Sequence, residues 1–170
     1  MENTRVTRAV NVMNVGQRAK WLFWFALFLL YGYGLVKVIL FKYGSVDAAV
    51  LGRQLQLAVD NPEHALNRLS FGNFTPLESI TRNLQRLSNR NDAVNLFGNI
   101  AIFAPLGAFV GLLSRWKWIG ATAVSFLVSL SLECAQIVFS MGTFDVDDLI
   151  LNTLGGLLGY AGYRLFTLQN

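Results

Sequence analysis

Residues 93–113 read AVNLFGNIAIFAPLGAFVGLL, and this apolar stretch decides the fold class. About 18 or more predominantly apolar residues with few charges suffice to cross a bilayer as a helix. The stretch passes that test, and its Gly107 and Gly111 lie four residues apart. Small residues at this spacing let a second helix approach closely, so the sequence predicts a transmembrane helix that packs against a neighbour.

Three further apolar runs lie outside this stretch, at residues 21–41, 116–139 and 149–166. The last run contains Gly155, Gly156, Gly159 and Gly162, which suit tight helix packing in lipid. Only 14% of the residues are charged, whereas a soluble domain carries about 25%. The chain is therefore predicted to be an all-α, polytopic membrane helical bundle with about four transmembrane helices.

The connector at residues 42–92 is too polar to cross the membrane, but its apolar residues are regularly spaced. Within it, residues 47–59 and 77–87 place apolar side chains three and four positions apart, as amphipathic helices do. Asn61 and Pro62 separate the two segments as a helix breaker. We expect both helices to lie on the membrane surface or to cap the bundle.

Charged residues in two short links predict how the bundle is oriented. The link at 114–117 contains Arg115 and Lys117 and no acid, whereas the link at 140–148 contains three aspartates and no base. Cytoplasmic loops are enriched in Lys and Arg, so the first link is expected inside the cell and the second outside. Both termini then lie in the cytoplasm, with residues 1–20 as a tail and residues 21–170 as one membrane domain.

The net charge of +4 does not indicate a nucleic-acid partner. The basic residues lie mostly at the edges of apolar runs, where cytoplasmic loops collect Lys and Arg. Nucleic-acid binding requires a basic patch on an accessible fold, so we expect membrane lipids and no nucleic acid as partners.

Ionisable and amide side chains inside apolar helices are the candidate functional residues, because a charge at the centre of a membrane helix costs about 2.5–3.5 kcal/mol. They share a face on each of three helices: Asn95 and Asn99, then Glu133 and Gln136, then Asp145, Asp148 and Asn152. With the orientation above, all three groups lie near the outer ends of their helices. The sequence therefore predicts one polar cluster at the outer face of the bilayer.

Each member of this cluster also has a purely structural interpretation. The asparagines could bond to a neighbouring helix, and Asp145 or Asp148 could cap the last helix. Asp147 is expected to face solvent. Glu133 is harder to explain in this way, because a buried carboxyl must be neutral, paired or hydrated. Its candidate partners are a connector arginine, a bound cation and a neighbouring carboxyl.

Metal and covalent chemistry find few of their usual residues in this sequence. His64 is the only histidine, which excludes a site built from several histidines, and no metal or cofactor is predicted. Cys134, the only cysteine, is expected to be a small buried hydrophobic residue. No activated serine or cysteine is recognisable, so covalent catalysis lacks its usual nucleophile.

Four segments of the chain resemble the VanZ-like family of bacterial membrane proteins. They are NFTPLESI (73–80), NLFGNIAIFAPLG (95–107), ECAQ (133–136) and FDVDDLILNTLGGLLGY (144–160), in the family's order. Many members have an arginine just before the FD of the last segment, where this chain has Gly142 and Thr143. A pairing of that arginine with Glu133 therefore does not carry over.

The resemblance implies a location, a phenotype and a set of ligand-binding residues. The matched positions are Asn73, Asn99, Glu133, Gln136, Asp145, Asp148 and Asn152. It implies a protein of the bacterial cell membrane that contributes to glycopeptide resistance, above all to teicoplanin, which bears a lipid chain. The expected partners are membrane lipids and a lipidated glycopeptide or a cell-wall precursor.

Three classes of function stay open at this point. The first is a binding or resistance module that takes a lipid headgroup or a lipidated antibiotic at the outer leaflet. The second is a membrane enzyme for a lipid or cell-wall precursor headgroup, with Glu133 as acid or base and Asp148 as a further catalytic candidate. In that enzyme Asp145 and Asp148 could hold a divalent cation. The third is a transporter or a structural partner subunit. Four short spans without an inverted repeat do not make a complete carrier in one copy, so a transporter would require a homo-oligomer, whereas the small-residue helix faces leave partner binding open.

The positions of the carboxylates separate these classes. Carboxylates around a shared open pocket would favour chemistry or a metal, whereas carboxylates bonded to backbone N–H groups would favour helix capping.

Overall fold

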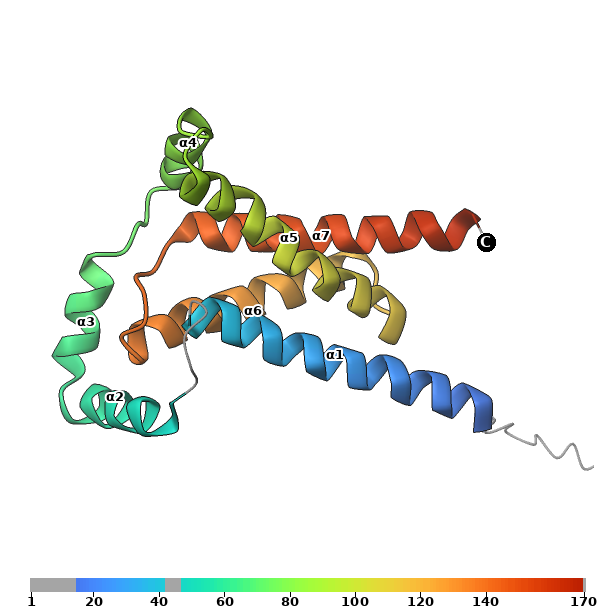
Figure 1. Cartoon of the computed structure of the whole chain (residues 1–170), viewed down its shortest axis with the longest axis horizontal. Helices are drawn as coiled ribbons and strands as arrows, with labels where there is room; N and C mark the ends of the chain where they lie inside the picture. The colour runs from blue at the N-terminus through green and yellow to red at the C-terminus, as the bar shows by residue number, and fades with distance from the viewer. Residues whose placement is uncertain (1–14, 42–46, 170) are drawn as a thin grey trace, which may run out of the picture.

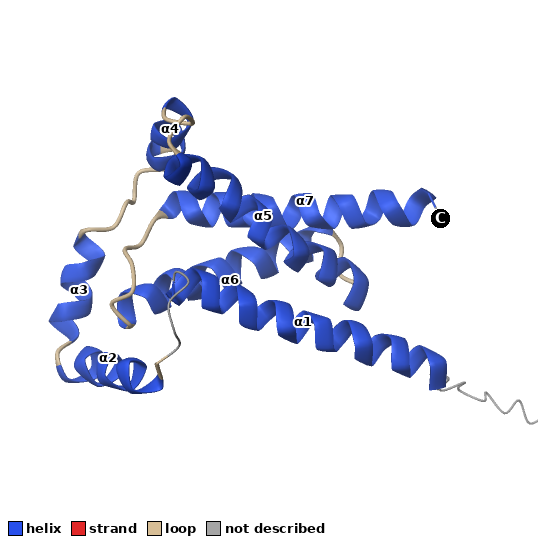
Figure 2. Cartoon of the chain, viewed as in Figure 1, coloured by secondary structure: helices blue, strands red, loops and turns tan. Residues whose placement is uncertain are grey.

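The computed structural model describes residues 15–41 and 47–169, and every regular element in these two ranges is a helix (Figures 1 and 2). The four long helices are α1 (Val15–Phe41), α5 (Arg90–Leu113), α6 (Trp118–Val138) and α7 (Val146–Gln169). The three short helices are α2 (Ala48–Asp60), α3 (Pro62–Ser70) and α4 (Glu78–Gln85). The all-α prediction is confirmed, whereas residues 1–14 of the expected tail lie outside the described ranges.

The long helices form a bundle whose two ends differ. Helix α7 packs along α5 and α6, and α1 packs against the same two helices less extensively. The start of α1, the link between α5 and α6 and the end of α7 lie at one end, while the short helices lie at the other (Figure 1). The buried apolar cluster joins α1, α5 and α6 through Leu35, Leu40, Phe103, Leu106 and Leu132.

Glycines bring α5 and α7 into backbone contact. A Cβ atom on Gly155 or Gly159 of α7 would collide with a backbone carbonyl group of α5. Gly107 of α5 meets the backbone of Gly156 in the same way. The close approach predicted from these small residues is confirmed, except at Gly162, where an added Cβ would meet nothing within 4 Å.

Three helices, α1, α5 and α6, are long and apolar enough to cross a membrane. Helix α7 has the same length as α5, 24 residues. Its mean hydropathy is lower because of its glycines and tyrosines, Asn152 and Arg164. The prediction of about four transmembrane helices is therefore supported for three of them.

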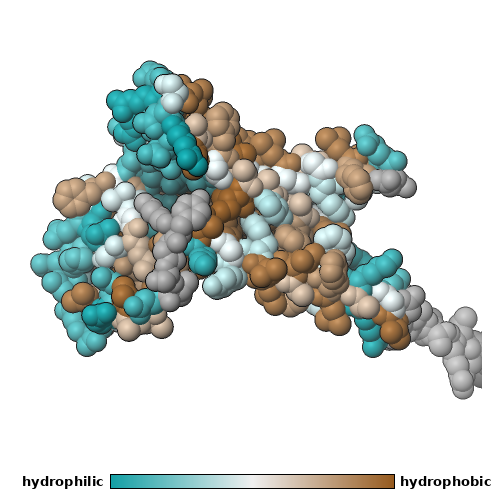
Figure 3. Space-filling model, in the orientation of Figure 1, coloured by the Kyte–Doolittle hydropathy of each residue, from teal (hydrophilic) through white to brown (hydrophobic). Residues whose placement is uncertain are grey.

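The outer surface of the molecule separates apolar from polar residues. Apolar residues, brown in Figure 3, cover much of the long helices, and polar residues, teal, gather on the short ones. Cys134 lies exposed on α6, so the expectation of a buried cysteine is wrong. Apolar patches of this extent mark surfaces that are covered by another apolar phase, which for spans of this length is lipid.

The short helices follow the connector pattern in two cases out of three. Helices α2 and α4 begin and end within a few residues of the predicted amphipathic segments. Asp47 caps α2, because its Oδ1 accepts the N–H of Ala49 at 2.8 Å and of Val50 at 3.2 Å. Helix α3 is not predicted, since Asn61 and Pro62 indicate only a break. Pro62 also begins α3, because a proline in the first turn of a helix loses no hydrogen bond.

Candidate functional site

A cavity of about 820 Å³ opens among α1, α5, α6 and α7 near the end of the bundle that carries the short helices. Apart from Thr143, its polar lining consists of carboxylates and carboxamides: Asn91, Asn95, Asn99, Glu133, Gln136, Asp145, Asp148 and Asn152. Its apolar lining consists of Val38 and Ile39 from α1 and of Val94, Ala101 and Ile102 from α5. The cavity therefore offers polar and apolar contacts together, as sites for amphiphilic molecules do.

Glu133 lies near the end of α6 and is only 2% exposed. Its Oε2 accepts a hydrogen bond from the backbone N–H of Asp145 at 3.0 Å. Gln136, one turn later, donates through Nε2 to the backbone carbonyl of Ile39 at 3.3 Å. These two side chains connect the end of α6 to the start of α7 and to α1, and both line the cavity.

Asp145 joins the connector to the start of α7. Its Oδ1 accepts the backbone N–H of Asp147 at 2.9 Å, which is the geometry of a helix N-cap. The same carboxylate accepts Nδ2 of Asn73 at 2.9 Å and the hydroxyl of Ser79 at 2.7 Å. The backbones of Asn73 and Asp145 also form an isolated parallel bridge. The predicted capping role is confirmed for Asp145.

Asp147 is the residue that sequence reasoning misplaced. It does not face solvent but is 0% exposed. Its Oδ1 accepts the N–H of Leu77 at 2.6 Å, and its Oδ2 accepts the N–H of Ile80 at 3.0 Å. Helix α4 follows Leu77, whose side chain has no oxygen to cap it, so α7 supplies the cap instead. No local signal in the sequence indicated this contact, because Asp147 and Leu77 lie 70 positions apart.

Asp148 and Asn152 lie one turn apart on α7. Oδ1 of Asp148 accepts Nδ2 of Asn99 on α5 at 2.6 Å, so this aspartate connects two helices instead of capping one. Asn152 is 4% exposed, and its Nδ2 donates to Oγ of Ser129 on α6 at 2.9 Å. Its Oδ1 accepts no hydrogen bond from a described residue. Because Asn152 lines the cavity, a buried acceptor remains available beside it.

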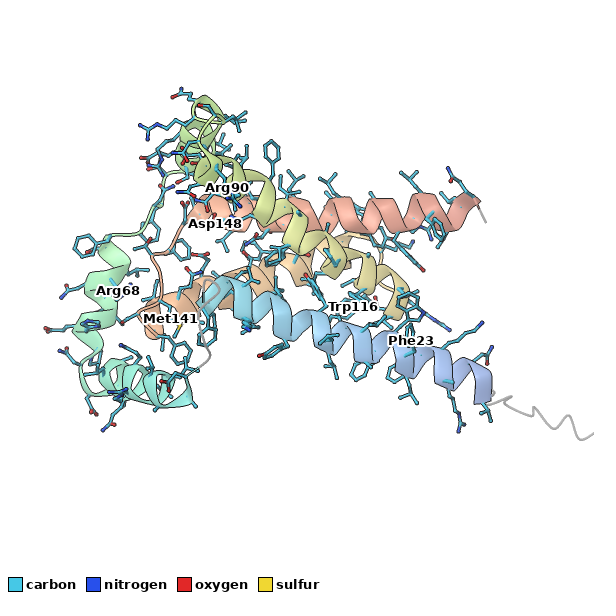
Figure 4. All side chains as sticks on the ribbon, in the orientation of Figure 1. Phe23, Arg68, Arg90, Trp116, Met141 and Asp148 are labelled. Carbon is cyan, nitrogen blue, oxygen red and sulfur yellow. The ribbon has the colours of Figure 1, made fainter. Side chains whose placement is uncertain are left out.

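The side-chain view separates the two ends of the bundle. Asp148 lies at the end near α4, whereas Phe23 and Trp116 lie toward the opposite end (Figure 4). The carboxylates of the cavity and these aromatic side chains therefore lie at opposite ends of the long helices.

The structure brings all seven predicted ligand-binding residues into one region. Six of them line the cavity directly, namely Asn99, Glu133, Gln136, Asp145, Asp148 and Asn152. The seventh, Asn73, contacts the site through Asp145. Asn91, which the predicted cluster did not include, adds a further amide to the lining. That these residues bind a ligand stays a prediction.

The cavity carboxylates show two arrangements at once: a shared open cavity, which favours catalysis or metal binding, and bonds to backbone N–H groups, which favour helix capping. Glu133 and Asp145 both accept a backbone N–H, and yet both line the same open cavity as Asp148. Among the described residues, no group of three or more His, Cys, Asp or Glu side chains is arranged to hold a metal ion.

Comparison with known proteins gives two matches that bear on this site. The family model described as VanZ/LLP1 matches residues 23–167 of this chain. Protein VanZ of Enterococcus faecium is 36% identical over 73 residues, a match that covers 41% of this chain and 44% of that protein. The matched part thus spans less than half of the relative's length. No solved structure matches the chain.

Proposed function

This chain belongs to the VanZ/LLP1 family, and we propose that it contributes to glycopeptide resistance, above all to teicoplanin. In this proposal the cavity binds a lipid headgroup or the lipid-bearing antibiotic itself at the outer leaflet of the bacterial cell membrane. The four segments from which the family was recognised all lie within the matched residues.

The observation that supports this proposal is the mixed lining of the cavity. Its carboxylates and amides can bond a polar headgroup, while Val38, Ile39 and Ile102 supply apolar contacts at the same opening. Of the four long helices, α1 packs least extensively against the others. Only 6% of its most apolar 18-residue stretch is buried. A headgroup held in the cavity would therefore leave its acyl chain beside α1, in lipid.

The proposal includes an orientation in which α7 is the fourth span. Its 24 residues extend about 36 Å at about 1.5 Å per residue, and a bilayer core is about 30 Å thick. Arg115 and Lys117 belong to the end of the bundle opposite the cavity, which favours the cytoplasm for that end. The cavity, the short helices and Asp145 then lie outside.

A second candidate function is a membrane enzyme that acts on a lipid or cell-wall precursor headgroup. The observation that favours it is Glu133, a buried carboxyl that nevertheless lines an open cavity beside Asp148. A carboxyl in that position can serve as a general acid or base. This function would require turnover of a headgroup, which pure binding does not, so product formation by the purified protein would separate the two.

The first experiment measures teicoplanin and vancomycin susceptibility of a bacterium that expresses the chain. We expect the wild type to raise the inhibitory concentration of teicoplanin, and Glu133→Gln to remove this protection at equal membrane abundance. The glutamine can still accept the N–H of Asp145, so the change removes the charge and keeps the acceptor.

The matched control for this experiment is Glu63→Gln, which removes a carboxylate from the exposed surface of α3. It is expected to keep the wild-type protection. An equal loss in both variants, or no protection from the wild type, would contradict the proposed function.

A further inference from the structure

A second, smaller cavity, the α3 cavity, lies between α3 and the link that joins α6 to α7. Its volume is about 320 Å³, and its described lining consists of His64, Asn67, Arg68, Phe71 and Thr143. The first four belong to α3 and its C-terminal cap, and their spacing places them on one face of the helix. This face is directed at the link, because Nη2 of Arg68 donates to the backbone carbonyl of Gly142 at 2.6 Å.

The guanidinium group of Arg68 has a buried donor without an acceptor. Its Nε is buried and donates to no described residue, whereas Nη2 of the same group is bonded to Gly142. A buried N–H group of this kind is costly unless an acceptor reaches it. The bond to Gly142 holds the guanidinium at the wall of the cavity, so an acceptor bound in the cavity would lie beside it.

The polar lining of the α3 cavity consists of side chains that can donate hydrogen bonds. They are a guanidinium, an imidazole, a carboxamide and a hydroxyl group, and the described lining residues include no Asp or Glu. The guanidinium is always protonated, and its fork of N–H groups matches the oxygens of a carboxylate or a phosphate. Donors reach the cavity both from α3 and from Thr143 of the link, which suits a tetrahedral phosphate better than a planar carboxylate.

Exposed apolar side chains lie on the same short helix as the cavity. Phe71, which lines the cavity, is 78% exposed, and Leu66 is 63% exposed. Helix α3 runs across the end of the bundle, and Arg68 lies beside the end of α6, where Met141 is found (Figures 1 and 4). Basic and apolar side chains together are typical of helices that lie in the headgroup layer of a membrane. A membrane lipid is therefore the favoured source of a phosphate.

We propose that the α3 cavity binds a phosphate group, with Arg68 as its main contact and with His64 and Thr143 as further donors. The exposed apolar side chains favour the phosphodiester of a membrane lipid, and a free phosphate ion is the other source of the same chemistry. The α3 cavity is separate from the larger cavity, although Thr143 lines both. The inference therefore does not depend on what the larger cavity binds.

The test measures binding of three probes to the full chain in dodecyl maltoside micelles, which contain no phosphate. The probes are dihexanoylphosphatidylglycerol, dihexanoylglycerol and sodium phosphate, titrated calorimetrically in a phosphate-free buffer, with empty micelles subtracted. We expect dihexanoylphosphatidylglycerol to bind about tenfold or more tighter than either of the other two. Tighter binding of sodium phosphate would keep the phosphate site and assign it to a soluble ion. Equal affinity for the two lipids, or saturable binding of neither phosphate probe, would overturn the proposal.

Two variants test the position of the phosphate. Arg68→Gln removes the positive charge and is expected to weaken binding of the tighter phosphate probe about tenfold or more, and His64→Gln about threefold. The matched control is Arg53→Gln, which removes an exposed arginine from α2 and should leave the affinity unchanged. Wild-type affinity in Arg68→Gln, or an equal loss in Arg53→Gln, would overturn the assignment to this cavity.

A further variant keeps the test decisive if Arg68→Gln does not fold, judged by circular dichroism. Thr143→Val replaces an exposed hydroxyl with a methyl group of similar size, and His64 is exposed as well. Both exposed positions can therefore be changed without disturbing the bond between Arg68 and Gly142. Weaker binding in Thr143→Val and His64→Gln would support the site, and wild-type affinity in both would overturn it.

Discussion

At the scale of single residues, the first turn of α7 holds the connector in place. Asp147 accepts two backbone N–H groups at the start of α4, and Asp145 accepts the side chains of Asn73 and Ser79. Hydrogen bonds to an ionised carboxylate are stronger than those between neutral groups. The start of α7 thereby holds α4 in place, although about 60 residues of chain separate the two helices.

Removal of the Asp147 carboxylate should release α4. In Asp147→Ala, the N–H groups of Leu77 and Ile80 lose their acceptors, and loss of a helix cap costs about 0.5–2 kcal/mol. We expect limited trypsin digestion at the exposed Arg82 to proceed about tenfold faster in this variant, because cleavage follows the population of the open form.

The control for the release of α4 is Asp60→Ala, at the exposed end of α2. Digestion at Arg82 should keep its wild-type rate in this variant. A wild-type rate in Asp147→Ala as well would show that the connector does not depend on the cap.

The cavity residues could be predicted from the sequence, but the partner of Asp147 could not. Glu133, Asp148 and Asn152 were recognised because helical spacing assigns each one to a face of an apolar helix. Asp147 bonds to residues 67 and 70 positions earlier, and no local pattern identifies a contact at that separation.

At the scale of elements, the α5–α7 interface depends on glycines that leave no room for a side chain. Gly155 and Gly159 place the backbone of α7 against carbonyl groups of α5, and Gly156 faces Ser125 of α6. Helix association in lipid relies on close packing of this kind, because lipid tails remove the hydrophobic drive that operates in water. The position of Asp148 opposite Asn99 therefore follows from glycines about two to three turns further along α7.

Two alanine substitutions on α7 should have opposite effects on stability. Gly159→Ala forces a methyl group into the carbonyl of Ala104 and should destabilise the protein by about 1–3 kcal/mol. Gly162→Ala meets nothing within 4 Å, and it should be neutral or stabilising by up to about 1 kcal/mol through helix propensity. Unfolding in a mixed-micelle denaturation series measures both. A Gly159→Ala variant as stable as Gly162→Ala would contradict the interface.

The sequence predicted the long elements more closely than the short ones. The apolar runs predicted the long helices to within six residues at every end, because lipid demands length. Helix α7 begins earlier than its apolar run, at Val146, because Asp145 caps it there. Helix α3 was missed because Pro62 has two meanings: it ends one helix and begins the next.

At the scale of the whole molecule, the fold places the basic link between α5 and α6 and the cavity at opposite ends. The basic link between α5 and α6 lies at one end of the bundle, and the acidic start of α7 lies at the other (Figure 1). The direction in which the helices cross the membrane therefore decides which side the cavity faces. We expect the cavity to face the outside of the cell.

Cysteine labelling tests this orientation. In a Cys134→Ser background, the variants Glu63→Cys, Arg115→Cys and Gln169→Cys each carry one exposed thiol. A membrane-impermeant maleimide should label the first in intact cells and the other two only after permeabilisation. Labelling at position 169 but not at position 115 in intact cells would contradict α7 as a fourth span. Labelling at positions 115 and 169 but not at position 63 would invert the orientation.

The bonds between the connector and the start of α7 have a consequence for the order of synthesis. Arg68 bonds to Gly142, Asn73 and Ser79 bond to Asp145, and α4 is capped by Asp147, all across 66 to 74 positions of chain. The ribosome completes the connector long before it makes the residues that hold it. The connector therefore remains without these hydrogen bonds until the start of α7 has been synthesised. The cavity, to which α7 contributes Asp148 and Asn152, is complete only after that stage.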